Sequence, residues 1–192
     1  MKIFISGGCK NGKSYYAQRL AKGQHSANTR GQGSLYYIAT MKPVDAEDNE
    51  RILRHRCERE GWGFTTIEQP VNIEKILDTC GHSHSFLLDS LTALLANEMF
   101  LSDGSVNEHA ARKIADGLVQ ITANIRDIVI VSDYIYSDAN VYDSLTEKYK
   151  KSLAEIDRTA AEHCDVVLEA AYTNVIAHKG REMFKALYEK IL

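Results

Sequence analysis

Gly7-Gly8-Cys9-Lys10-Asn11-Gly12-Lys13-Ser14, close to the start of the chain, fits the pattern G-x-x-x-x-G-K-[ST] at every position. The run Lys2–Ser6 before it has the residues of a β-strand, and the segment Ser14–Lys22 after it has the residues of a helix. The alternative is a glycine-rich turn that merely reverses the chain, but the complete motif in a strand–turn–helix context argues against it. The match predicts a phosphate-binding loop, the P-loop, over residues 7–14.

The residue types of this loop indicate which ligand it holds. Its glycines let successive backbone N–H groups turn inward around phosphate oxygens, and the N-terminus of the helix adds a partial positive charge. Lys13 is expected to reach the β- and γ-phosphates, and the Ser14 hydroxyl is expected to bind Mg²⁺. The loop therefore predicts binding of a nucleoside triphosphate such as GTP or ATP, together with Mg²⁺.

Short apolar runs alternate with longer segments of helical period along the rest of the chain, which predicts an α/β fold. We expect a mostly parallel sheet flanked by helices, of the RecA-like P-loop NTPase type, in a single domain over residues 1–192. The polar segment Gly23–Ser34 is expected to be a mobile loop. The predicted strands are Lys2–Ser6, Leu35–Ala39, Phe64–Ile67, Phe86–Leu88, Ile128–Val131 and Val166–Ala170, and helices are predicted at Ser14–Lys22, Asp45–Glu60 and Ser90–Ala96 and over 110–125 and 145–160.

The composition excludes several classes of protein. A net charge of −3 gives no overall basic field, so nucleic acid is not an expected partner. The four cysteines are far apart in the sequence and form no CxxC pair, which favours a reducing cytoplasm. No apolar stretch is long enough to cross a bilayer or to act as a signal peptide. We therefore expect a cytoplasmic protein without membrane insertion.

A carboxylate that could hold the metal follows another apolar run. P-loop enzymes use an acid at the end of a neighbouring strand for this purpose, and Asp89 directly follows Phe86–Leu88. Because Ser90–Ala96 is predicted to be helical and aspartate favours helix N-termini, Asp89 could equally be a helix cap. The pattern alone leaves both interpretations open.

Cations and a histidine alternate along the charged segment Asp45–Glu60. Arg51, His55 and Arg59 are spaced i, i+4 and would share one helical face. The neighbouring guanidinium groups would keep the imidazole neutral, and a neutral imidazole can attack phosphorus as a nucleophile. The alternative is a solvated, salt-bridged helix with an ordinary surface histidine.

These residues together resemble the bifunctional adenosylcobinamide kinase/adenosylcobinamide-phosphate guanylyltransferases of cobalamin biosynthesis. The resemblance covers residues 1–100 in order and spacing. The P-loop carries it together with Tyr37-Ile38-Ala39-Thr40, Arg51-Ile52, His55-Arg56 with Arg59, Phe64-Thr65-Thr66-Ile67-Glu68, and Leu87-Leu88-Asp89 with Asn97.

The resemblance implies two reactions in one site. The γ-phosphate of ATP or GTP passes to a hydroxyl of adenosylcobinamide, with Lys13 and Mg²⁺ neutralising the transferred group. His55 then attacks the α-phosphate of GTP, expels pyrophosphate and passes GMP to adenosylcobinamide phosphate. The family also implies a homotrimer. Nucleotide contacts are implied for Thr40, Met41, Arg51, Arg56, Arg59, Glu68 and Asp89.

The second half of the chain departs from the family pattern. Many relatives carry Asn-Glu-Val-Gly after the fifth strand, whereas this chain reads Ser132-Asp133-Tyr134-Ile135-Tyr136-Ser137-Asp138. Because this loop leaves the carboxyl end of a strand, its acids and tyrosines could contact the corrinoid or could simply cap a helix. The alternatives for the whole protein are a P-loop small-molecule kinase with one of these activities and a nucleotide-dependent regulatory protein.

Overall fold

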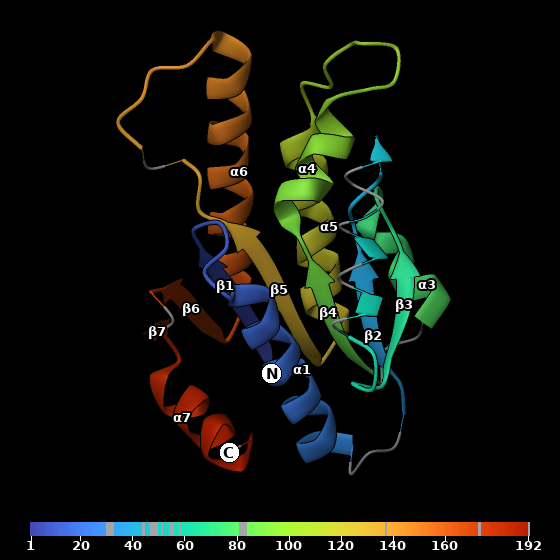
Figure 1. Cartoon of the computed structure of the whole chain (residues 1–192), viewed down its shortest axis with the longest axis vertical. Coiled ribbons are helices and arrows are strands. Elements are labelled where there is room, and N and C mark those ends of the chain that lie inside the picture. Colours follow the sequence, from blue (N-terminus) through green and yellow to red (C-terminus); the bar gives the residue numbers. More distant parts are fainter. Residues whose placement is uncertain are drawn as a thin grey trace.

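The chain forms one seven-stranded sheet with helices on both faces (Figure 1). The computed structural model describes residues 1–29, 33–43, 45–46, 50, 52–53, 56–57, 59–80, 84–136, 138–172 and 174–191. The strands are β1 (Lys2–Gly7), β2 (Leu35–Ala39), β3 (Phe64–Glu68), β4 (Ser85–Asp89), β5 (Asp127–Asp133), β6 (Val166–Ala171) and β7 (Asn174–Lys179). The helices are α1 (Lys13–Thr29), the 3-10 turn η1 (Ile73–Lys75), α3 (Ile76–Cys80), α4 (Leu91–Met99), α5 (Ala110–Asn124), α6 (Ser144–His163) and α7 (Arg181–Ile191).

The strands lie in the order β3-β2-β4-β5-β1-β6-β7, and all neighbouring pairs are parallel except β6 and β7. The sheet confirms the mostly parallel α/β sheet flanked by helices that the sequence predicted. Over the described part of the chain, none of the helices combines the length and the apolar character that crossing a bilayer requires.

The central strands are buried on both faces, as parallel strands between helical layers must be. Alternate residues of β4 and β5, such as Leu88 and Ile130, pack against α4, α5 and α6. The residues between them, such as Leu87 and Val129, pack against α1 on the opposite face. Each strand thus contributes to both apolar clusters, which fixes the position of its carboxyl end.

The connections after β1 and β5 leave the sheet on opposite faces. The chain runs from β1 into α1, and from β5 through the 134–143 loop into α6, although β1 and β5 are neighbours. Figure 1 shows α6 and its preceding loop rising above the carboxyl edge of the sheet. A crevice for ligands forms where neighbouring strands send their connections to opposite faces. In this protein that point lies between Gly7 and Asp133.

Two expectations about local structure were wrong or incomplete. The segment expected to be a mobile loop from Gly23 is helical as far as Thr29, because Gln24 is 1% exposed and donates a hydrogen bond to the Met1 carbonyl at 2.7 Å. The sequence reading also missed β7 and α7. The predicted helix Asp45–Glu60 is described at some positions only, and those described between 46 and 57 are helical.

Candidate nucleotide-binding site

The backbone of the P-loop needs glycine at two positions. A Cβ atom on Gly7 would lie 2.4 Å from the Ala170 carbonyl oxygen, so no larger residue fits there. Gly12 has a φ of +82°, a left-handed conformation in which side chains are strained. The loop therefore turns tightly out of β1 and directs the chain into the N-terminus of α1.

Lys13 lies inside this turn and not in solvent. Its residue is 7% exposed, and its ammonium group donates to the Gly8 carbonyl oxygen at 3.1 Å. The ammonium group also forms an ion pair with the Asp133 carboxylate at the end of β5. Asp133 lies beside Gly7 in the β1–β5 register, so the sheet itself brings this acid to the P-loop.

Asn11 is a variable position of the motif, and the sequence gave no reason to single it out within the loop. Its amide nitrogen donates to the Ala170 carbonyl oxygen at 2.5 Å, and its amide oxygen accepts from the Lys13 backbone N–H at 3.1 Å. The side chain therefore fastens the loop to β6 and to the start of α1. Only the strand order, with β6 beside β1, could have revealed this role.

Asp89 ends β4 at the same edge of the sheet. Its carboxylate accepts a hydrogen bond from the Tyr37 hydroxyl at 2.8 Å. The helix-cap alternative for Asp89 is wrong, because Ser90 is the N-cap of α4 and accepts from the Ala93 N–H. Asp89 lies beside Val131, and Val131 lies beside Ile5, so this acid is one strand farther from the P-loop than Asp133.

The oxygen donors at this edge suit Mg²⁺, which takes one or two protein ligands and completes its shell with water and phosphate oxygens. Ser14 stands at the start of α1 and Asp89 at the end of β4. The described residues contain no cluster of three or more acidic, histidine or cysteine side chains that could hold a metal alone. Ser14 and Asp89 as metal ligands, with phosphate as the remaining partner, stay a prediction that fits this arrangement.

Thr40 supports the carboxyl edge from within. The residue is fully buried, and its hydroxyl donates to the Ser90 carbonyl at 2.7 Å and accepts from the Ser90 N–H at 2.8 Å. The Asn97 amide donates to the Thr40 carbonyl at 2.7 Å. The structure therefore gives Thr40 a role in tying β2 to β4, while nucleotide contacts by Thr40 and the half-buried Met41 stay predictions.

The cations expected to hold phosphate have protein partners. Arg59 is 8% exposed, and its guanidinium carbon lies 3.7 Å from the centre of the Tyr37 ring. Arg56 forms an ion pair with Glu68 at 2.6 Å, and both side chains are more than half exposed. Arg51 and His55 lie outside the described residues, so the predicted stripe of Arg51, His55 and Arg59 remains untested.

The divergent loop after β5 is held by its own side chains. Asp138 accepts from Lys150 and from the Tyr142 hydroxyl, each at 2.7 Å. Asp143 accepts from two backbone N–H groups at the start of α6 and caps that helix. The sequence left open whether the acids of residues 132–138 bind a ligand or cap a helix, and the residue that caps α6 is Asp143, outside that stretch.

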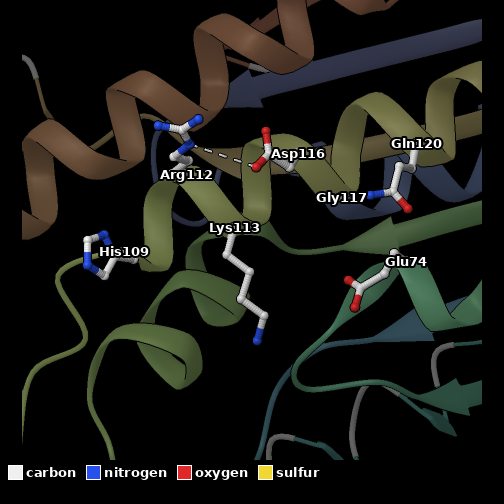
Figure 2. Close-up of a pocket in the computed structure, with 7 residues that line it drawn as sticks. All are labelled: Glu74, His109, Arg112, Lys113, Asp116, Gly117 and Gln120. Atoms are coloured by element: carbon white, nitrogen blue, oxygen red, sulfur yellow. Dashed lines mark ion pairs between the residues drawn. The ribbon is translucent and has the colours of Figure 1, made fainter.

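A separate hollow lies on the outer side of α5 (Figure 2). It has a volume of about 500 Å³ and is lined by residues of both charges, with Arg112 and Asp116 4.0 Å apart and Lys113 turned to Glu98 at 2.6 Å. Its cations are thus already paired with acids. No residue of the P-loop or of the β4 and β5 ends lines it, so it is not part of the nucleotide site.

The chain is similar to several known proteins. The family described as cobinamide kinase/cobinamide phosphate guanyltransferase matches residues 3–173. The bifunctional adenosylcobalamin biosynthesis protein CobP of Pseudomonas aeruginosa is 26% identical over 168 residues, which cover 87% of this chain and 91% of that protein. Among solved structures, a KaiC-like protein of Pyrococcus horikoshii has 10% identity and a TM-score of 0.48, with coverage of 94% of this chain and 79% of that one. Another P. horikoshii protein has 9% identity and a TM-score of 0.44, with coverage of 93% and 85%.

Proposed function

The chain belongs to the cobinamide kinase/cobinamide phosphate guanyltransferase family, and from this premise we propose that it carries out both reactions in cobalamin biosynthesis. It phosphorylates adenosylcobinamide with ATP or GTP and then transfers GMP from GTP to adenosylcobinamide phosphate, which gives adenosylcobinamide-GDP and pyrophosphate. The observation that carries the proposal is a complete P-loop, with Lys13 buried beside Asp133, in a chain matched by the family from residue 3 to residue 173.

In the phosphoryl-transfer step the P-loop supplies most of the electrostatic stabilisation. Backbone N–H groups of residues 7–14 and the Lys13 ammonium neutralise charge on the transferring group. Ser14 and Asp89 would hold Mg²⁺, which would supply positive charge against the phosphates. Tyr37 orients the Asp89 carboxylate through its hydrogen bond. The nucleotide lies over the crevice between β1 and β5.

In the guanylyl-transfer step His55 is the nucleophile. Its nitrogen forms a bond to the α-phosphorus of GTP while the bond to the leaving pyrophosphate breaks. GMP then passes from the histidine to a phosphate oxygen of adenosylcobinamide phosphate. The family resemblance implies a nucleotide contact for Arg51. Arg56 and Glu68 change partners from each other to the nucleotide, with Arg56 on phosphate and Glu68 on guanine. Both side chains are exposed enough to do so.

A labelled nucleotide tests the histidine. Protein incubated with GTP labelled at the α-phosphate is expected to acquire an acid-labile label that maps to His55, and His55→Asn is expected to acquire none. The parent protein is also expected to convert adenosylcobinamide to the GDP derivative, detected by mass spectrometry. Label on another residue would remove His55 from the mechanism.

The same measurements separate the alternatives. A small-molecule kinase would phosphorylate the corrinoid without any protein-bound GMP, and a nucleotide-dependent regulatory protein would give neither product. The proposal also includes a homotrimer, which the family resemblance implies, and a cytoplasmic location, which the cysteine pattern favours. Sedimentation equilibrium of the purified protein is expected to give three times the monomer mass.

A further inference from the structure

We propose that Asp133 is the general base of the phosphoryl-transfer step, the group that takes the proton from the acceptor hydroxyl. This inference rests on the proposed function and adds a catalytic residue to it. The family pattern does not supply this residue, because the chain departs from that pattern at residues 132–138.

The backbone of Asp133 is fixed relative to the P-loop on both sides. Asp133 pairs with Gly7 in the β1–β5 register, and the N–H of the next residue, Tyr134, donates to the Gly7 carbonyl at 2.9 Å. The Asp133 N–H itself donates to the Thr92 hydroxyl of α4 at 3.0 Å. The carboxylate is therefore held beside the loop by the sheet and by a helix, as a catalytic group must be.

The position of the carboxylate relative to Lys13 defines where it acts. Its ion pair with the Lys13 ammonium places it beside the group that contacts the β- and γ-phosphates. The side chain is 24% exposed, whereas that of Lys13 is 8% exposed, so Asp133 forms the part of the pair that an incoming acceptor can reach. An acceptor hydroxyl in line with the γ-phosphorus would approach this oxygen.

Other acids at the carboxyl edge, among the described residues, are committed elsewhere. Asp89 accepts from Tyr37 and lies one strand farther away. Asp138 is held by Lys150 and Tyr142, and Asp143 caps α6. Asp133 is thus the described acid in contact with the P-loop lysine.

The step balances without a further reactant. The acceptor oxygen forms a bond to the γ-phosphorus as its proton moves to an Asp133 oxygen. The bond between the γ-phosphorus and the β–γ bridging oxygen breaks, and the nucleoside diphosphate leaves with that electron pair. The products are the phosphate ester, the nucleoside diphosphate and a proton that Asp133 returns to solvent.

The second reaction of the same protein provides the control. GMP transfer to adenosylcobinamide phosphate needs the P-loop, Mg²⁺ and the nucleotide, but its acceptor is a phosphate oxygen and not a hydroxyl. A general base for the hydroxyl is therefore dispensable in guanylyl transfer. A structural residue or a metal ligand would be needed in both reactions.

The test compares Asp133→Asn with the parent protein in single-turnover assays of each reaction. We expect the rate of adenosylcobinamide phosphorylation to fall about 10²- to 10⁴-fold, the range general bases supply. The rate of GMP transfer to chemically supplied adenosylcobinamide phosphate is expected to stay within about threefold of the parent rate. The Kd for GTP is expected not to rise, because Lys13 loses only a partner that competes with the nucleotide. Asp133→Glu keeps a carboxylate and is expected to recover part of the phosphorylation rate.

Asp116→Asn removes one exposed acid on α5 outside the site and serves as the matched control. Phosphorylation retained in Asp133→Asn, or an equal loss of both reactions, would overturn the role as a base. A parent protein that cannot phosphorylate adenosylcobinamide at all would instead overturn the proposed function, and this inference with it.

Discussion

The Asp157 carboxyl group on α6 is 2% exposed and accepts a hydrogen bond from the Tyr136 hydroxyl at 3.1 Å. Burial is the main reason that its pKa rises from 3.8 to about 7, and the Tyr136 hydrogen bond opposes this only in part. Because the pKa is higher in the folded than in the unfolded chain, the folded state binds the proton more tightly. The resulting stabilisation is complete below pH ~4 and is lost as the pH rises through ~7.

The Asp157→Asn variant should therefore lose less stability than the parent protein between pH 5 and pH 8. The difference over this pH range is at most about 3 kcal/mol in the free energy of unfolding. Urea denaturation at a series of pH values measures it, with Asp116→Asn as a control for removing an exposed acid. Parallel curves for parent and Asp157→Asn would show that this carboxyl group does not couple folding to protonation.

At the residue scale, sequence could predict side chains that a motif fixes and not those that the sheet brings together. Lys13 is fixed by its place in the P-loop pattern, and Asp89 by its place after an apolar strand. Asp133 contacts Lys13 because β5 lies beside β1, and Asn11 contacts the Ala170 carbonyl because β6 lies on the other side of β1. Because a parallel sheet takes its strand order from tertiary packing, nothing local in the sequence indicates these contacts.

Between elements, the Thr40 hydroxyl joins the end of β2 to the Asp89–Ser90 corner by two hydrogen bonds. Thr40→Val keeps the shape of the side chain but leaves the Ser90 N–H without this acceptor, while the Ser90 carbonyl still accepts from the Leu94 N–H at 3.1 Å. Leaving such a donor unsatisfied costs about 1–3 kcal/mol. We expect Thr40→Val to lower the free energy of unfolding by about that amount and to raise the Mg²⁺ concentration needed for activity, since Asp89 lies at the same corner.

Thr40→Ser retains the hydroxyl and is the matched control for this prediction. Urea denaturation and Mg²⁺ titration of the phosphorylation rate are measured on both variants. Equal behaviour of Thr40→Val and Thr40→Ser would mean that the hydroxyl bridge does not position the metal side of the site.

Elements with strong apolar patterns were predictable, and elements whose formation depends on tertiary contacts were not. The runs in β4 and β5 are buried on both faces and stand out in the sequence. β7 is an edge strand with mostly exposed residues, so it lacks such a run. The C-terminal part of α1 contains Gly23, which disfavours helix, but Gln24 is buried there.

For the whole molecule, the nucleotide site lies where both apolar clusters meet. β1 and β5 contribute residues to the layers on both faces, and the P-loop and Asp133 extend directly from their ends. A ligand that contacts these ends is linked to the folding of the entire sheet, since it binds the folded chain and not the unfolded one.

Magnesium and GTP at about 100 times the dissociation constant should therefore stabilise the fold by about 2.7 kcal/mol. For a domain of this size the melting temperature is expected to rise by roughly 5–10 °C, measured by differential scanning fluorimetry with and without EDTA. Lys13→Ala should abolish most of the rise, because the ammonium group that meets the β- and γ-phosphates is gone. Lys185→Ala, which removes an exposed lysine of α7, should retain it. The assignment of the P-loop as a nucleotide site would be contradicted if neither GTP nor ATP changed the melting temperature of the parent protein in the presence of Mg²⁺. A ligand held at the junction of both clusters cannot leave the stability of the sheet unchanged.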